Sequence, residues 1–199
     1  DIEKYHGESD VKAAYIEGLD SFAVKVASGF FNNPKLGLPS SNGLMILLDS
    51  QTGVIKSVLL DKGYLTDVRT AIAGAIASKY LSNPESSTVA IIGTGIQARM
   101  QLEALTLVRD IKNVNVWSRD IKKTHAYIED VSKNINLNFT AFDNTNAVVN
   151  NADILITTTP SKKPLVDYSS LPKGIHITAM GSDAEEKNEL EPEIIKNCD

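Results

Sequence analysis

The sequence predicts an α/β protein in two parts. Before residue 60 the apolar runs are short and strand-like, and turn residues separate them. From residue 88 onward, short apolar runs alternate with amphipathic stretches of helical length. This alternation predicts a parallel sheet with right-handed helical crossovers. The chain has 199 residues, of which 42% are hydrophobic, so it is long enough for one large or two small globular domains.

The first part is expected to contain two hairpins and one long loop. Residues 10–27 and 44–60 each contain two alternating runs around a short turn. Gly53 lies in the second turn, where a positive φ is favoured. Residues 30–43 are dense in Asn, Pro, Gly and Ser, and we expect a long loop there. Such a loop is usually functional or mobile.

A helix is expected to close the first part. Thr66 is the predicted N-cap, and apolar residues recur at helical spacing after it. The helix is rich in Ala and Gly, which indicates close packing against another element. Pro84 ends it. We place the domain boundary there, so that residues 1–84 form a substrate-binding and dimerisation domain of α+β type and residues 85–199 form the second domain.

A glycine motif follows the first strand of the second part. Thr88–Ile92 is an apolar, β-branched run, and residues 93–98 read G-x-G-x-x-A directly after it. Gly93 would permit a tight turn, Gly95 would let a pyrophosphate approach the backbone, and Ala98 would keep the next helix close to the sheet. The start of that helix would attract the phosphate charge. The motif predicts a Rossmann-type dinucleotide-binding domain; the alternative is a glycine-rich turn in another α/β protein.

The remaining elements place small and polar residues at the ends of the strands, where ligands bind in parallel sheets. Strands are expected at residues 88–92, 114–117, 137–142, 153–157 and 175–180, and helices at 97–108, 121–133, 145–150 and 191–197. The cofactor-binding residues expected in the motif and at these ends are Gly93, Thr94, Gly95, Ile96, Gln97, Ser118, Arg119, Thr157, Thr158, Met180 and Gly181.

The end of the second predicted strand bears on the choice of nicotinamide cofactor. An NAD site usually has an acidic residue here, which binds the ribose 2′-hydroxyl. In this chain Ser118 offers a hydroxyl, and Arg119 offers a planar cation suited to a 2′-phosphate. We predict that NADP(H) is preferred and that NAD(H) is possible. In the alternative interpretation, Arg119 is a solvated surface charge and Asp120 binds the ribose.

Charge and composition exclude some classes of function. The net charge of −5 gives no support for a nucleic-acid or membrane-surface partner. No apolar run reaches the ~18 residues of a membrane span. The single Cys198 fits a reducing compartment and has no partners for a metal site, so we expect a cytoplasmic protein without a metal. The chain starts with Asp and has five predicted strands after Ser87, so we expect that both ends of a longer chain are missing.

Several separated motifs resemble the ornithine cyclodeaminase/μ-crystallin family, with the ectoine-utilisation, cyclodeaminase-like branch as the nearest group. The matching motifs are Phe22–Lys25, residues 37–43, Gly63–Ala71, Val89–Ala98 and Gly181–Asp183. Similar family members include cyclodeaminases, alanine dehydrogenases, ketimine reductases and NADPH-binding crystallins. Their shared chemistry is hydride exchange between a nicotinamide and the α-carbon of an amino acid or its imine.

The resemblance implies roles for four residues. Lys25 would meet the substrate carboxylate or amine, and Arg69 would clamp the carboxylate through its bidentate fork. Asp183 would be the acid/base or the carboxylate that orients the amine, and Thr70 would lie near the cofactor phosphates. This set suits the chemistry, because hydride removal leaves a cationic imine beside a carboxylate. Alternatively, Lys25 is an outward-facing edge lysine, Arg69 a helix-surface residue and Asp183 a loop carboxylate.

The resemblance also implies a homodimer and a second arginine upstream of the matched region. No arginine precedes Arg69 in this chain, so that residue lies in a missing segment or has been lost. Two other functions remain open. One is a crystallin-like protein that binds NADPH without catalysis. The other is a structural α/β module without a cofactor.

Overall fold

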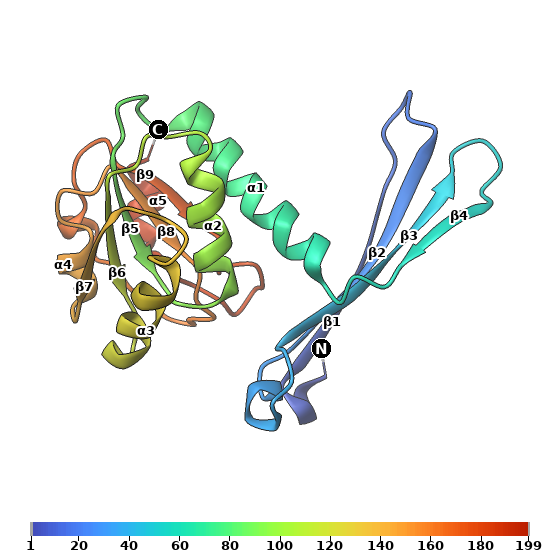
Figure 1. Ribbon diagram of the computed structural model, residues 1–199, viewed down its shortest axis with the longest axis horizontal. Helices are drawn as coiled ribbons and strands as arrows, with labels where there is room; N and C mark the ends of the chain where they lie inside the picture. Colours follow the sequence, from blue (N-terminus) through green and yellow to red (C-terminus); the bar gives the residue numbers. More distant parts are fainter. Residues whose placement is uncertain (1, 199) are drawn as a thin grey trace. The chain divides into compact units, whose positions relative to one another are not determined.

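The computed structural model describes residues 2–198, which form two compact units divided between Arg69 and Thr70. An antiparallel sheet makes up most of the first unit, and a parallel sheet with helices makes up the second (Figure 1). This is the α/β architecture that the sequence predicts. The division lies inside a helix, whereas the boundary predicted at residues 84–85 marks the change from that helix to the parallel sheet.

The first unit is a four-stranded antiparallel sheet in the order β1-β2-β3-β4. Its strands are β1 (Gly7–Ala14), β2 (Ser21–Phe30), β3 (Ser41–Asp49) and β4 (Ile55–Leu59), with 3-10 turns at Glu3–Tyr5 and Asn33–Leu36. Both predicted hairpins are confirmed. Because β2 pairs with a strand on each side, Lys25 lies opposite Lys12 and Met45 and is not on an edge strand.

The long loop expected at residues 30–43 is shorter and more ordered than predicted. Strand β2 continues to Phe30, whose N–H donates to the carbonyl of Ser40. Inside the loop, Gly37 ends the 3-10 turn with φ 72°, and Asn33 donates its side-chain amide to the carbonyl of Pro39. These local hydrogen bonds, typical of Asn- and Gly-containing turns, replace an irregular loop.

Helix α1 (Tyr64–Leu81) begins two residues before the predicted N-cap, so the assignment of Thr66 was wrong. Instead, the carboxylate of Asp61 accepts a hydrogen bond from the N–H of Leu65 at 2.7 Å, after the positive-φ residue Gly63. The helix ends before Pro84, as predicted.

The second unit is a five-stranded parallel sheet in the order β7-β6-β5-β8-β9. Its strands are β5 (Thr88–Ile92), β6 (Asn113–Trp117), β7 (Asn138–Phe142), β8 (Ile154–Thr157) and β9 (His176–Ala179). Its remaining helices are α2 (Ile96–Thr106), α3 (Ile121–Val131), α4 (Thr145–Val148), α5 (Pro192–Lys196) and the 3-10 turn Tyr168–Ser170. All five predicted strands are confirmed, and the strand order reverses next to β5, which makes a topological switch point.

Strand β5 is buried on both faces, which explains its unbroken apolar sequence. Val89 and Ile91 pack in a cluster with α2 and α3, whereas Ala90 and Ile92 pack in a second cluster with Val148 of α4. Each fully buried Ile or Val contributes ~1.5–3 kcal/mol relative to an exposed position. The core therefore fixes the turn that follows β5.

Small residues bring α1 and α2 together within the second unit. Ala71 and Ala75 of α1 pack against Ala104 of α2. A Cβ on Gly74 would lie 2.0 Å from Oε1 of Gln101, so a larger residue there would force the Gln101 side chain to move. This contact confirms the close packing that the Ala- and Gly-rich sequence predicts.

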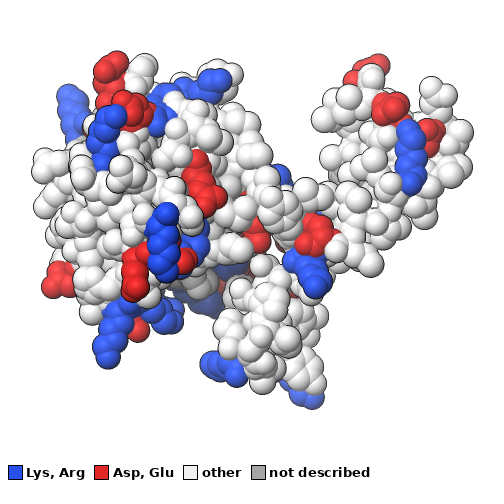
Figure 2. All heavy atoms as spheres, in the orientation of Figure 1, with Lys and Arg blue, Asp and Glu red and all other residues white. Residues whose placement is uncertain are grey.

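No helix among the described residues is long and apolar enough to cross a membrane. On the face shown in Figure 2, basic and acidic side chains lie interspersed among uncharged residues. Such mixing matches the moderate net charge of the sequence.

Candidate functional site

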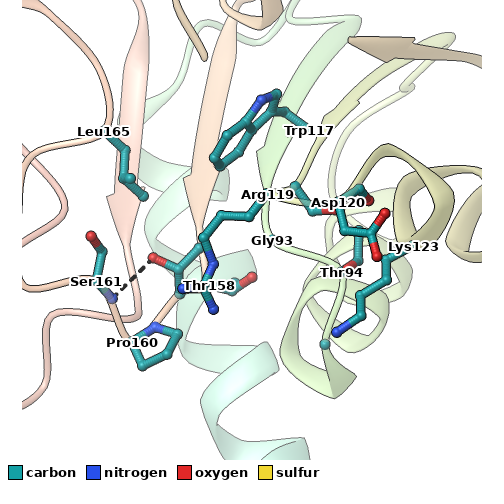
Figure 3. Close-up of a pocket in the computed structure, with 13 residues that line it drawn as sticks. Gly93, Thr94, Trp117, Arg119, Asp120, Lys123, Thr158, Pro160, Ser161 and Leu165 are labelled. Carbon is teal, nitrogen blue, oxygen red and sulfur yellow. Dashed lines mark hydrogen bonds between the residues drawn. The ribbon is translucent and has the colours of Figure 1, made fainter. Parts of the chain in front are cut away.

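A cavity of about 260 Å³ lies at the carboxyl ends of β5, β6 and β8 in the second unit (Figure 3). This is the edge at which parallel sheets bind ligands. The lining residues are Gly93, Thr94, Gly95, Trp117, Ser118, Arg119, Asp120, Lys123, Thr158, Thr159, Pro160, Ser161 and Leu165. Six of the predicted cofactor-binding residues therefore share one cavity, namely Gly93, Thr94, Gly95, Ser118, Arg119 and Thr158.

The two motif glycines that line the cavity have different roles. Gly93 has φ 118°, and a Cβ there would lie 2.5 Å from Oγ1 of Thr158, so the tight turn requires glycine. Gly95 has an ordinary φ of −79°, and a Cβ there would meet no atom within 4 Å. The space above Gly95 is thus open, as a bound pyrophosphate would require.

The start of α2 is suited to an anion. Gly95 is the N-cap residue, and it supplies no side-chain hydrogen bond to the first turn. The N–H groups at the start of an 11-residue helix, together with its dipole, favour a negative charge at this end. The residues present therefore fit a dinucleotide pyrophosphate.

Cations and one carboxylate line the side of the cavity after β6. In Figure 3 the side chain of Arg119 reaches across toward Thr158 and Pro160, and Lys123 extends from α3 into the same space. Asp120 is engaged as the N-cap of α3, where Oδ1 accepts a hydrogen bond from the N–H of Lys122 at 3.0 Å. Two cations line this side of the cavity, and the carboxylate of Asp120 is already engaged as a helix cap. This arrangement suits an anionic group such as a 2′-phosphate better than the two hydroxyls of an unphosphorylated ribose.

Ser118 holds the turn between β6 and α3. Its hydroxyl donates to the carbonyl of Asp120 at 2.9 Å and lies 2.9 Å from the hydroxyl of the buried Thr124. Lys123 of α3 was not expected from the sequence, although its position one turn into the helix after Arg119 could have indicated it.

The other predicted cofactor residues do not line this cavity. Ile96 and Gln97 open α2, and the carbonyl of Thr70 accepts a hydrogen bond from Gln101 at 3.1 Å. Thr157 is fully buried behind the wall that Thr158 and Thr159 form. Met180 and Gly181 follow β9, and the N–H of each donates to the carbonyl of Thr157.

The predicted catalytic residues fall in both units. Lys25 and Arg69 belong to the first unit. Burial lowers the pKa of Lys25, and the nearby cations of Arg69 and Lys12 lower it further, against the raising effect of Asp10 and Asp61. A lysine in such a cationic setting is suited to bind an anion.

Asp183 lies in the second unit, in the loop after β9. Its Oδ1 accepts a hydrogen bond from Nζ of Lys187 at 2.8 Å. The Lys187 side chain is 8% exposed, whereas that of Asp183 is 65% exposed. Lys187 is thus a positively charged neighbour that the sequence analysis missed, although an acid and a lysine four residues apart are a recognisable signal.

A parallel sheet with this strand order, a glycine turn open above the start of α2, and cations after the second strand define a Rossmann-type fold whose cavity fits a dinucleotide. The chain belongs to the ornithine cyclodeaminase/mu-crystallin family, whose family model matches residues 1–199.

Sequence and structure comparisons agree with this membership. The chain is 52% identical over 199 residues to a protein of Sinorhizobium fredii named uncharacterized cyclodeaminase y4tK, covering all of this chain and 60% of that protein. Its structure matches Delta(1)-pyrroline-2-carboxylate reductase of Thermococcus litoralis, solved with NADH and L-proline, with a TM-score of 0.91 and 32% identity over 98% of this chain and 60% of the other. It also matches an archaeal alanine dehydrogenase dimer with bound NAD, with a TM-score of 0.83 and 31% identity over 98% of this chain and 63% of the other. The chain thus spans about 60% of the length of these relatives.

Proposed function

We propose that this chain is part of an NADP(H)-dependent enzyme that exchanges hydride with the α-carbon of a small amino acid or its imine. The observation that carries the proposal is the open space above Gly95 in a cavity that Arg119 also lines. Family membership supports the substrate class. NAD(H) is the cofactor named for the structural relatives, and Arg119 with Lys123 favours the phosphorylated form here.

The proposed roles of the side chains follow from the charges that the reaction creates. Oxidation of the amino acid breaks the Cα–H bond and gives an imine, the reduced cofactor and a proton. Lys25 and Arg69 would hold the substrate carboxylate, and Asp183 would take or return the proton of the amine. A nicotinamide, when bound, supplies the hydride acceptor in this direction and the donor in reverse.

Within this class we propose cyclodeaminase chemistry on a diamino acid such as ornithine, as in the ectoine-utilisation branch. The 52% identity to a relative named as an uncharacterized cyclodeaminase supports this choice. Ring closure onto the imine, loss of ammonia and return of the hydride would regenerate the oxidised cofactor. The full-length protein should therefore consume ornithine and release ammonia without net formation of NADPH.

A second candidate is an imine reductase or amino-acid dehydrogenase. The TM-score of 0.91 to a pyrroline-2-carboxylate reductase favours it. Ornithine, alanine and pyrroline-2-carboxylate should be tested in parallel while NADPH absorbance and ammonia are followed. Net oxidation of NADPH by the imine alone would select the reductase, and net reduction of NADP⁺ by alanine would select the dehydrogenase.

A non-catalytic NADPH-binding protein is the remaining alternative. Binding without turnover of any of the three substrates, equal in wild type, Lys25→Ala and Asp183→Ala, would support it. If neither NADPH nor NADH raises the melting temperature, the nucleotide-binding proposal itself is wrong, because a ligand at 100 times its Kd adds ~2.7 kcal/mol of stability.

We also propose that the protein forms a homodimer. Apolar side chains remain exposed on both edge strands of the antiparallel sheet, with Val11 69% and Val58 53% exposed. An alanine dehydrogenase relative is described as a dimer. Sedimentation of the full-length protein as a monomer at micromolar concentration would contradict this proposal.

A further inference from the structure

A fully buried carboxylate lies behind the β8 side of the cavity. Glu189 is 0% exposed, although its neighbours in sequence form a charged loop. Oε1 accepts hydrogen bonds from the N–H and the hydroxyl of Thr159 at 2.6 and 2.7 Å. Oε2 accepts them from the hydroxyl of Thr157 at 2.8 Å and the N–H of Gly181 at 2.9 Å. A buried carboxylate with this many donors is a built feature of the fold.

Glu189 links the loop after β8 to the loop after β9, beyond the point where the pairing of the two strands ends. The last register pair of β8 and β9 is Thr157 with Ala179, and the two loops begin beyond it. Through its two oxygens, Glu189 holds Thr159 on one loop and Gly181 on the other. A Cβ on Gly181 would lie 2.2 Å from the carbonyl oxygen of Thr159, so the loops are tightly packed there.

Both loops carry residues of the proposed site. Thr158 and Thr159 form part of the cavity wall, and Gly181 leads to Asp183. The main chain of Glu189 adds to the link, because its N–H donates to Oγ of Ser182 at 3.1 Å. The pyrophosphate and adenosine side of the proposed site lies at Gly95 and the end of β6, where the described hydrogen bonds of Ser118 and Asp120 do not include Glu189.

We infer that Glu189 is a positioning residue for the nicotinamide half of the dinucleotide. This inference rests on the proposed function, because a dinucleotide held at Gly95 and Arg119 extends across the switch point toward β8 and β9. Glu189 would not touch the substrate. Instead, its hydrogen bonds fix the loop after β9, which carries Asp183, relative to the loop after β8, which carries Thr158.

The chemistry of the donors requires a carboxylate. The two backbone N–H groups point at different oxygens, that of Thr159 at Oε1 and that of Gly181 at Oε2. In a Glu189→Gln variant, the side-chain NH₂ group must face one of these N–H groups in either orientation of the amide. Neither N–H can become an acceptor, so one of these two hydrogen bonds is lost: either the N–H of Thr159 loses its acceptor, or the N–H of Gly181 keeps only its longer bond to the carbonyl of Thr157 at 3.2 Å.

The test compares two ligands in the full-length protein. NADPH contains the nicotinamide, whereas 2′-phospho-ADP-ribose keeps the adenosine, the 2′-phosphate and the pyrophosphate without it. We expect Glu189→Gln to weaken NADPH binding about tenfold and 2′-phospho-ADP-ribose binding much less, because the lost hydrogen bond lies in the β8 and β9 loops and not at Gly95 or the end of β6. Glu186→Gln is the matched control, since Glu186 is exposed in the same loop.

If Glu189→Gln does not fold, two substitutions of Thr157 that perturb the structure less can be used instead. Thr157→Val removes one donor and keeps the carboxylate, and Thr157→Ser restores the hydroxyl. We expect a severalfold loss of NADPH affinity in the first and near-complete rescue in the second. The change in KM for NADPH should follow the same order.

Two results would overturn the inference. The first is equal NADPH affinity in Glu189→Gln and wild type. The second is an equal loss of affinity for both ligands with a matching fall in melting temperature, which indicates a purely structural role. If wild type binds neither ligand, the proposed function fails instead, so the two failures are distinguishable.

Discussion

The hydroxyl of Thr158 occupies the place where a side chain on Gly93 would begin. Oγ1 of Thr158 lies 2.5 Å from the position of a Cβ on Gly93, and it donates to the carbonyl of Ile92 at 3.3 Å. The turn after β5 therefore rests directly on the loop after β8. The residue at position 93 must be glycine for two reasons, its φ of 118° and this contact.

Gly93→Ala should therefore unfold more easily than wild type. We expect a loss of ~1–3 kcal/mol in the free energy of unfolding, because alanine at this φ is strained and Thr158 must move. Urea denaturation measures it. An unchanged midpoint and slope would show that the turn can relax without cost.

Gly95→Ala is the matched comparison, and it should behave in the opposite way. A methyl group there meets no protein atom within 4 Å and φ is ordinary, so stability should change by less than ~0.5 kcal/mol. NADPH binding should be lost, because the methyl group occupies the space proposed for the pyrophosphate. Fluorescence titration with NADPH measures this, and unchanged affinity would contradict the proposed binding mode.

Arg119→Met should change the choice of cofactor. We expect NADPH to bind ~10–100-fold more weakly and NADH to bind about as before, because only NADPH carries the 2′-phosphate that a charge-assisted hydrogen bond would hold. Lys122→Met is the control, since Lys122 is an exposed cation on α3 that does not line the cavity. An equal effect on both cofactors would place Arg119 elsewhere than at the 2′-phosphate.

Lys25 should lose its proton at a lower pH than an exposed lysine. Burial and the cation of Arg69 lower its pKa from the ordinary 10.5. For a base, a lowered pKa means that the folded state disfavours the proton. Lys25 therefore costs stability at neutral pH, and this cost is lost as the pH rises from its lowered pKa to the ordinary value of 10.5. Carboxylate binding by Lys25 should weaken over the same range.

NMR titration of ¹³C-methylated lysines can test this expectation. In Arg69→Met the pKa of Lys25 should rise only part of the way toward 10.5, because burial is the larger cause. A Lys25 signal that titrates with those of the exposed lysines would show that the side chain is fully solvated.

Arg109→Met should destabilise the second unit through the end of α1. The guanidinium of Arg109 donates to the carbonyls of Ser78, Lys79 and Ser82 at 2.8–2.9 Å, and so satisfies acceptors at the helix C-terminus. Its loss should cost ~1–3 kcal/mol in thermal or urea unfolding. Lys133→Met, which removes an ion pair with Asp130 in which both side chains are mostly exposed, should cost less than ~1 kcal/mol. Equal effects of the two variants would contradict the capping role.

The sequence was most informative where local rules decide the structure. Strand β5, Gly93 and the end of α1 before Pro84 were predicted because a buried strand, a positive φ and a proline each restrict the chain directly. The start of α1 was predicted incorrectly because Thr66 and Asp61 are both capping residue types, and only the path of the chain through Gly63 selects Asp61.

The parts of the site that were missed depend on contacts distant in sequence. Glu189 lies in a run of charged residues that reads as a solvated loop, and its partner Thr157 is 32 residues away. Nothing local distinguishes Glu189 from the exposed Glu185 and Glu186. The low exposure of the Lys187 side chain could not be recognised from the local sequence either, because it depends on the three-dimensional path of the loop.

The position of Glu189 also bears on how the protein is made. A ribosome synthesises β5 to β9 before it reaches Glu189, so the loops at Thr159 and Gly181 emerge while their common acceptor is still inside the exit tunnel. The parallel sheet of the nascent chain can form first, but the loops after β8 and β9 are not joined to each other until the segment that contains Glu189 has emerged.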